Sequence, residues 1–207
     1  MEGYENYDLQ EEDPYLQANS TCLINCLNIQ DTKLLNEAEQ EGVAINLAEL
    51  IKSPIAGDFN LAHLSAIHQA LFADIYPWAG QVRLTEISKG GQLFLPYQLI
   101  EKVANEIFSE LHAENLLANL AKPALIQRVA YYFGRINAIH AFREGNGRTQ
   151  RVFFDQLVAL HGYAFEWAAV SGEKMAQACL AARQREPSYQ LLVNLFKLHL
   201  KALNSLR

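Results

Sequence analysis

The chain has 207 residues, a length that suits a single domain with a sizeable hydrophobic core. Half of the residues are apolar and 19% are charged, as in ordinary soluble globular proteins, and the net charge of −6 argues against direct nucleic-acid binding over a broad surface. No apolar run approaches the ~20 residues that cross a bilayer, and the N-terminus lacks the basic and apolar regions of a signal peptide, so we expect a cytoplasmic protein with no membrane contact.

The chain opens with an acidic segment. Residues 1–14 contain six acidic residues and no basic one, which is typical of a solvated tail. We expect residues 1–12 to form a flexible tail that Tyr4 and Tyr7 could dock, and residues 13–207 to form one domain.

Three cysteines bear on the redox environment. Cys22 and Cys26 lie four residues apart, one helical turn, and Cys179 is distant in the sequence. An odd number of cysteines without a neighbouring His or Asp cluster indicates reduced, packed thiols rather than a disulfide. Metal binding by Cys22 and Cys26 is the alternative.

Helical periodicity dominates the first two thirds of the chain. The first predicted helix runs to Ile51, with Gly42 as a candidate break, and a later one runs to Ile139, directly before a glycine-rich segment. Four predicted helices precede the glycine-rich segment, and each begins at a residue that can cap or open a helix: Asp31, Asn60, Pro96 and Pro123.

Residues 81–95 break the helical pattern. β-branched and apolar residues flank Gly90 and Gly91, which predicts a β-hairpin that turns at the two glycines. From the residues alone, a solvated hairpin that covers the core is as acceptable as a functional element.

The last third of the chain predicts three more helices, at 149–161, roughly 172–184 and roughly 187–203. The whole chain therefore reads as an all-α fold of about seven to eight helices. We assign the apolar stripes of these helices to the core, among them Leu34, Ile51 and Leu160. We assign the three aromatic residues after the first of these helices to the core as well, rather than to a nucleotide base: Tyr163, Phe165 and Trp167.

The segment from His140 to Arg151 gathers groups that handle phosphate. Because it joins two predicted helices, Gly145 and Gly147 lie in a tight loop that leads into a helix N-terminus, where free N–H groups and the helix dipole attract anions. Both glycines let the backbone approach a phosphate closely, and Asn146 between them offers an amide donor.

Other side chains of this segment suit the remaining chemistry. His140 carries an imidazole, which can act as a general base towards a hydroxyl. Glu144, the only carboxylate of the loop, suits a Mg²⁺ ion that it shares with phosphate oxygens. Arg148 and Arg151 lie three residues apart, hence roughly on one helix face, and their planar guanidinium groups suit phosphate. Arg143 has no evident role, and we expect it to be solvated.

These twelve residues resemble the signature of the Fic domain: His, Pro, Phe, any residue, Asp or Glu, Gly, Asn, Gly, Arg, two variable residues, then Arg or Asn. The chain departs from it only at Ala141, where proline is usual. Because proline would restrict His140 to an extended backbone, we expect alanine to loosen the approach to the loop without abolishing the chemistry. Residues 13–16 and 72–80 also resemble the family. The resemblance thus covers about residues 13–200 and implies the Fic fold.

The resemblance implies transfer of AMP from ATP to a Ser, Thr or Tyr hydroxyl of a target protein, with release of pyrophosphate. His140 would deprotonate the hydroxyl, and Glu144 would hold Mg²⁺ against the α- and β-phosphates. A phosphate-transferring branch of the family lacks the second glycine, so the intact Gly147 favours adenylyl transfer. The residues implied to bind ATP are Gly145, Asn146, Gly147, Arg148 and Arg151.

In this family the hairpin forms a flap over the active site, and its exposed edge pairs with the backbone of the target. Such pairing reads backbone rather than side chains, which makes the target hard to infer. The flap residues implied to dock the target are Thr85, Glu86, Ile87, Ser88, Lys89 and Gly90.

The resemblance also implies control by a partner. Many Fic proteins are inhibited by a helix bearing Ser or Thr, three residues, Glu, then Gly or Asn, and this chain lacks that pattern. The inhibitor is then a separate small antitoxin whose glutamate pairs with Arg151. Compact bacterial toxins of this layout resemble those that modify topoisomerases, which makes a topoisomerase a candidate target.

Two other functions remain open from the sequence. The chain could be a Fic-fold module that binds a nucleotide or a partner without turnover, or it could transfer another phosphate-containing group.

Overall fold

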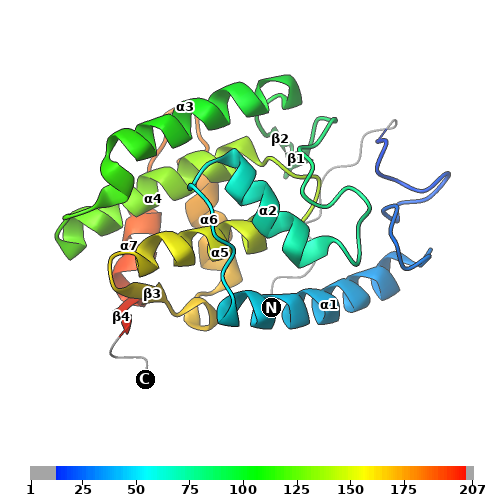
Figure 1. Cartoon of the computed structure of the whole chain (residues 1–207). Coiled ribbons are helices and arrows are strands. Elements are labelled where there is room, and N and C mark those ends of the chain that lie inside the picture. The colour runs from blue at the N-terminus through cyan, green and yellow to red at the C-terminus, as the bar shows by residue number, and fades with distance from the viewer. Residues whose placement is uncertain (1–12, 204–207) are drawn as a thin grey trace.

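Seven α-helices and two short pairs of strands make up residues 13–203, the part of the chain that the computed structural model describes (Figure 1). The helices are α1 (Thr32–Lys52), α2 (Leu61–Phe72), α3 (Ile100–Ala113), α4 (Lys122–Ile139), α5 (Asn146–Ala159), α6 (Gly172–Ala182) and α7 (Gln190–His199). The strands are β1 (Ser88–Lys89), β2 (Gln92–Leu93), β3 (Tyr163–Phe165) and β4 (Leu200–Ala202). The predicted all-α fold with a hairpin is confirmed. The acidic tail of residues 1–12 lies outside the described residues.

Helix α4 lies at the centre of the fold (Figure 1). It packs against α3, α5, α6 and α7, while α2 packs on α5 and joins α1 to the bundle. The ring of Phe133 on α4 lies 5.1 Å from that of Phe154 on α5 and 5.2 Å from that of Phe196 on α7, measured between centroids. This aromatic core packs α4 against α5 and α7, and the loop between α4 and α5 carries the motif.

Local sequence signals set the first two helices. The Asp31 carboxylate accepts the backbone N–H of Leu34 at 2.9 Å, and the Asn60 side chain accepts that of His63 at 2.9 Å, so both predicted caps are confirmed. The predicted break at Gly42 is wrong, because α1 continues through it. The absent side chain of Gly42 instead makes room for Ile75, whose Cδ1 would lie 3.3 Å from a Cβ at this position.

Several apolar residues assigned to the core lie on the surface. Leu34 and Ile51 are 56% and 73% exposed, because α1 packs through one face only and both residues fall outside it; Leu160, just beyond the end of α5, is 58% exposed. The helix predicted at roughly 187–203 is shorter, because the chain leaves α7 at Leu200 to form β4. Strand β4 pairs antiparallel with β3, a contact between distant segments that no local pattern reveals.

All three cysteines are free thiols, as predicted. Cys22 is fully buried, Cys179 is partly buried, and Cys26 is exposed, so only the first is packed as expected. Residues 20–30 contain bends, one isolated bridge and one turn, and no helix.

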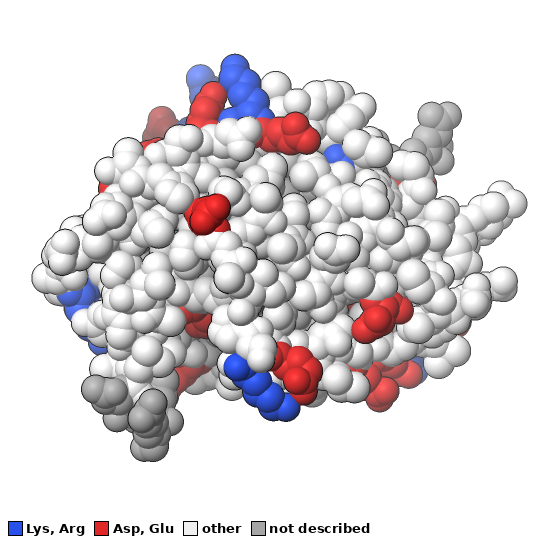
Figure 2. Space-filling model, in the orientation of Figure 1, with Lys and Arg blue, Asp and Glu red and all other residues white. Residues whose placement is uncertain are grey.

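The distribution of charged side chains on the surface agrees with the expectation from the net charge. On the face that Figure 2 shows, acidic and basic side chains are scattered among uncharged residues and form no broad basic patch. None of the helices in residues 13–203 combines the length and the apolar character that crossing a membrane requires.

A buried histidine joins α2 to the motif loop. His68 is fully buried, and its ring stacks on that of Phe142 with centroids 4.0 Å apart. Its Nδ1 accepts the Gly80 N–H at 2.8 Å, so the proton is on Nε2, which donates to the Glu144 carbonyl at 2.9 Å. Burial lowers the pKa of His68 to about 3, because a charged imidazolium would lose its hydration there.

His68 should therefore lower the free energy of unfolding as the pH becomes mildly acidic. Below its unfolded pKa near 6.5, the unfolded chain binds a proton that the folded chain does not, so stability falls as pH decreases. His68→Asn lacks this proton, and its deficit in unfolding free energy relative to the parent should shrink by about 1.4 kcal/mol between pH 7.5 and 5.5. Urea unfolding of both proteins at the two pH values measures this. Burial raises the pKa of Asp155 to about 6, but Asp155 is present in both proteins and cancels from the difference. A deficit that stays constant with pH would contradict the assignment.

Two glycines inside helices should respond oppositely to alanine. A Cβ at Gly134 on α4 would lie 2.7 Å from the Tyr189 ring and 2.8 Å from Ala182 Cβ, so overpacking should cost about 1–3 kcal/mol. At Gly42 the nearest atom is the flexible end of Ile75, so the helix propensity of alanine should prevail and add up to about 1 kcal/mol. Thermal unfolding of Gly134→Ala and Gly42→Ala measures both changes. Equal shifts in the same direction would show that the two helix contacts do not differ in this way.

Candidate active site

The motif forms the connection between α4 and α5. Helix α5 begins at Asn146, three residues before the predicted start, so Gly147 and Arg148 belong to its first turn. Gly145 precedes the helix with φ +80°, and a Cβ there would lie 2.3 Å from the ring of Phe72. Only glycine fits at this position, so α2 can pack directly on the loop that leads into the α5 N-terminus.

Asn146 braces the loop from inside. Its side-chain oxygen accepts the Phe142 N–H at 2.9 Å, and its amide nitrogen donates to the Phe142 carbonyl at 2.7 Å. The Asn146 side chain thus closes the loop as a backbone pair would. The contact of Asn146 with the α-phosphate stays a prediction, and so does phosphate binding by the backbone amide of Gly145.

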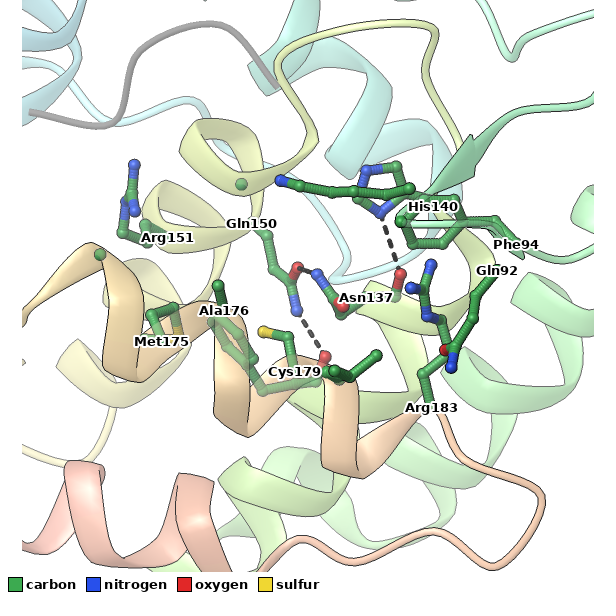
Figure 3. A pocket seen from close by; sticks show the side chains of 16 residues that line it. Gln92, Phe94, Asn137, His140, Gln150, Arg151, Met175, Ala176, Cys179 and Arg183 are labelled. Atoms are coloured by element: carbon green, nitrogen blue, oxygen red, sulfur yellow. Dashed lines mark hydrogen bonds between the residues drawn. The ribbon is translucent and has the colours of Figure 1, made fainter. Parts of the chain in front are cut away.

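His140 is held in one orientation at the end of α4. Its ring stacks on Phe94 of the hairpin, with centroids 3.8 Å apart and an interplanar angle of 18°. Its Nδ1 lies 3.0 Å from the Asn137 carbonyl, which can only accept, so Nδ1 carries the proton and the basic lone pair is on Nε2 (Figure 3). That tautomer suits a general base.

The backbone of His140 is left-handed, with φ 49° and ψ 64°. A proline at position 141 would push this backbone towards the extended region, whereas Ala141 leaves the left-handed conformation accessible. The carbonyl of Ala141 accepts the backbone N–H of Arg83 at 2.9 Å. Whether alanine loosens the loop stays a prediction.

A pocket of about 380 Å³ opens beside His140 (Figure 3). Its lining comes from the hairpin, α4, the start of α5, and α6. Figure 3 shows Arg151 at one end and His140, Phe94 and Arg183 towards the other. The residues that line it are Lys89, Gly90, Gln92, Phe94, Phe133, Asn137, His140, Gly147, Gln150, Arg151, Gly172, Met175, Ala176, Cys179, Leu180 and Arg183.

The charge of the pocket favours an anion. Lys89, Arg151 and Arg183 contribute positive side chains, and the described lining residues include no carboxylate. The first turn of α5 adds the positive end of a helix dipole, because Gly147 also lines the pocket.

Arg151 lines this pocket and Arg148 does not, although the two lie three residues apart on α5. Arg148 instead lies between two carboxylates, with Nη2 at 2.6 Å from Glu39 Oε1 and 3.3 Å from Glu144 Oε1. Glu39 is a buried residue of α1 that also accepts the Tyr76 hydroxyl. Three residues leave the two positions about 60° apart around the helix, and the ion pair with Glu39 holds the long side chain of Arg148 away from the pocket.

Glu144, the predicted magnesium ligand, is buried at the α5 N-terminus. Its Oε1 accepts the Gly145 N–H at 2.8 Å as well as pairing with Arg148. Among residues 13–203, no group of three or more His, Cys, Asp or Glu side chains forms a candidate metal site.

The prediction that Arg143 is solvated is wrong. Arg143 is 3% exposed, and its Nε and Nη2 both lie 2.7 Å from Asp13 Oδ2. The carboxylate of Asp13 also accepts the Tyr15 N–H. This ion pair joins residues 130 positions apart, which explains why no local pattern indicated it.

The predicted hairpin is confirmed, although its regular strands are much shorter than residues 81–95. Strands β1 and β2 pair Ser88 with Leu93 and turn at Gly90 and Gly91. Of the predicted docking residues, Lys89 and Gly90 line the pocket. The other four do not: Thr85 and Ile87 are buried, and Glu86 and Ser88 are half-buried.

The aromatic residues after α5 belong to the core, as predicted. Phe165 is buried against Phe196, and the indole of Trp167 donates to Asp155 at 2.6 Å. Tyr163 is partly buried against the same core.

Four functional candidates were not indicated by the sequence. Asn137 and Arg183 looked like ordinary helix residues, yet both line the pocket, and Arg183 lies 3.9 Å from the centre of the Phe94 ring. Arg83 and Glu39 looked like surface charges, yet both are 1% exposed. The one local signal for Arg83 is that it lies between two apolar residues, Val82 and Leu84.

Known proteins resemble this chain in sequence. The pattern of the Fic/DOC family matches residues 58–158. The protein adenylyltransferase VbhT of Bartonella schoenbuchensis is 39% identical over 81% of this chain, which spans 35% of that longer protein. The probable protein adenylyltransferase Fic of Salmonella typhimurium is 37% identical over 80% of this chain and 82% of its own length.

Solved structures agree with the fold. The BepC protein of Bartonella tribocorum with bound AMPPNP superposes with a TM-score of 0.84 at 26% identity, covering 91% of this chain and 96% of the other. An N-terminal Fic domain from Bartonella quintana with bound ADP gives a TM-score of 0.85 at 26% identity, over 93% and 96%. With the signature from His140 to Arg151 beside a cationic pocket, and relatives matched along most of its length, this chain belongs to the Fic/DOC family.

Proposed function

We propose that this protein transfers AMP from ATP to a Ser, Thr or Tyr hydroxyl of a target protein and releases pyrophosphate. The observation that carries the proposal is a histidine held as the Nδ1–H tautomer beside a pocket with three cationic side chains and a helix N-terminus. The relatives named protein adenylyltransferase match about 80% of the chain, so it is an enzyme of that class. The two similar structures with AMPPNP and ADP support a nucleotide substrate.

His140 would act as the general base. The target hydroxyl gives its proton to Nε2 while its oxygen bonds to the α-phosphorus of ATP, and the bond from that phosphorus to pyrophosphate breaks. The stacking on Phe94 and the hydrogen bond to Asn137 orient the imidazole before the reaction begins, so the ring need not reorient during it.

The start of α5 would bind the phosphates. Gly147 and Arg151 both line the pocket and lie one helical turn apart, so amide groups and a guanidinium face the same ligand. We assign the γ-phosphate to Arg151. Arg148, paired with two carboxylates, supports the loop rather than the phosphates.

Glu144 would hold Mg²⁺. The donor set fits, because Mg²⁺ in such sites commonly binds one or two protein carboxylates and takes phosphate oxygens and water for its other positions. When bound, the ion would offset the charge of the phosphates. The hydrogen bond from Gly145 to Oε1 keeps the Glu144 carboxylate at the loop.

The hairpin would align the target. Its sheet contains only β1 and β2 among the described residues, so β1 can add a further strand on its other edge. Lys89 and Gly90 lie at the pocket, so a hydroxyl on such a strand would approach His140.

A separate cytoplasmic antitoxin would control this activity by directing a glutamate to Arg151. The chain carries no inhibitory Ser/Thr-xxx-Glu-Gly/Asn pattern of its own, which supports inhibition in trans. The target class remains a topoisomerase, by resemblance to compact bacterial Fic toxins.

The purified chain should label protein in a bacterial lysate when ATP labelled at the α-phosphate and Mg²⁺ are added. His140→Ala should lower the labelling rate by roughly 100-fold or more, because it removes the base. Mass spectrometry of the labelled band identifies the modified residue and the target. Label from the γ-phosphate would instead indicate phosphoryl transfer, and nucleotide binding without any labelled band would indicate a module without turnover. A silent parent chain that is switched on by replacing one of its own glutamates would contradict inhibition in trans.

Arg151 should distinguish nucleotides by their γ-phosphate. Arg151→Gln should weaken AMPPNP binding by about tenfold or more, because a charged hydrogen bond is lost, and should change AMP binding by less than about twofold. Titration calorimetry measures both ligands, with Arg185→Gln, an exposed arginine, as the control. Equal losses for AMPPNP and AMP would rule out the γ-phosphate contact.

A further inference from the structure

Arg83 is a deeply buried charge beside the active site that the proposed mechanism does not use. It is 1% exposed and lies between α2 and β1, where Leu84 beside it is 68% exposed. Its guanidinium therefore points inwards, into a region where every donor needs an acceptor.

The acceptors of Arg83 come from two parts of the fold. On the motif side, Nε donates to the His140 carbonyl at 2.8 Å, and Nη2 donates to the Ile139 carbonyl at 3.2 Å. On the hairpin side, Nη1 donates to the Thr85 carbonyl at 2.6 Å, and Nη2 donates to the Leu95 carbonyl. One side chain thus joins the end of α4 to both arms of the hairpin.

The two bonds on the motif side fix the backbone of His140. Each peptide unit is planar, so the carbonyl of Ile139 marks the plane before the His140 Cα, and the carbonyl of His140 marks the plane after it. Fixing both planes fixes φ and ψ of His140. That is needed here because its left-handed backbone is unfavourable for a residue with a Cβ.

The bonds on the hairpin side fix the ring of His140. Leu95 follows Phe94, whose ring stacks on the imidazole, and the Leu95 N–H donates to the Ala138 carbonyl at 3.3 Å. Arg83 therefore acts on His140 twice, through its backbone and through the ring that covers it.

We propose that Arg83 is a positioning residue that holds the His140 imidazole in its reactive place and ties that place to the position of the hairpin. The inference rests on the proposed function, in which His140 is the base and the hairpin aligns the target. A lysine cannot replace Arg83, because one ammonium group cannot reach carbonyls on both sides as the planar guanidinium does.

The test compares Arg83→Lys with Arg128→Lys in the full chain. Arg128 lies on α4, forms ion pairs with Glu110 and Glu114, is partly exposed, and does not line the pocket. For Arg83→Lys we expect kcat of AMP transfer to fall by roughly 10- to 100-fold, the effect of a misplaced catalytic group, while the Kd of AMPPNP stays within about threefold. For Arg128→Lys, kcat should stay within about threefold.

A spectroscopic readout keeps this test independent of turnover. In protein labelled with ¹³C-histidine, the ring signal of His140, assigned from its absence in His140→Ala, should shift in Arg83→Lys and stay in place in Arg128→Lys. If the parent chain transfers no AMP, the proposed function fails, and the ring signal still decides whether Arg83 positions His140. An unmoved signal, or an unchanged kcat, would overturn the inference. So would a failure of both Arg83→Lys and Arg83→Gln to fold, since Arg83 would then be a purely structural residue.

Discussion

A buried loop must find a partner for each of its polar groups, and the connection from His140 to Arg148 meets this constraint through the N-terminal segment, α1 and α2. The N-terminal segment supplies Asp13 to Arg143, α1 supplies Glu39 to Arg148, and α2 supplies His68 to the Glu144 carbonyl. If these polar groups were buried without partners, they would cost more free energy than the packing contacts of the loop contribute. The loop is therefore stable only within the assembled fold. The architecture of the whole domain can be understood as support for this one connection.

That support divides the motif into two sides. Glu39 and Asp13 draw Arg148 and Arg143 inwards, and Asn146 closes the loop on itself. The groups left at the pocket carry the proposed chemistry: a base, a helix N-terminus and Arg151. Holding the inner side so firmly lets the outer side present fixed dipoles and charges to a phosphate, which is the arrangement that stabilises developing charge without reorganisation.

Local signals predicted the parts of this structure that depend on local chemistry. Asp31 and Asn60 cap helices because their side chains accept neighbouring N–H groups, and Gly90 and Gly91 turn the hairpin because they tolerate positive φ. The motif from His140 to Arg151 could be recognised from the sequence for the same reason, because its twelve residues are contiguous. The errors lie where long-range contacts decide. Arg143 and Asp13 are 130 positions apart, β4 pairs with the distant β3, and Arg148 pairs with a carboxylate from α1 and does not line the pocket.

The departure at Ala141 illustrates how tertiary contacts take over a local role. In the family signature, a proline at this position would restrict the residue before it through its own ring. Here His140 is left-handed, a conformation that alanine permits, and the planes on both sides of its Cα are bound by Arg83. A proline at position 141 would favour an extended His140, whereas Arg83 holds a left-handed one, so the two constraints are alternatives. The rigidity of the base would depend on a buried guanidinium 57 positions away, and the hairpin would share that dependence because the same group binds both of its arms.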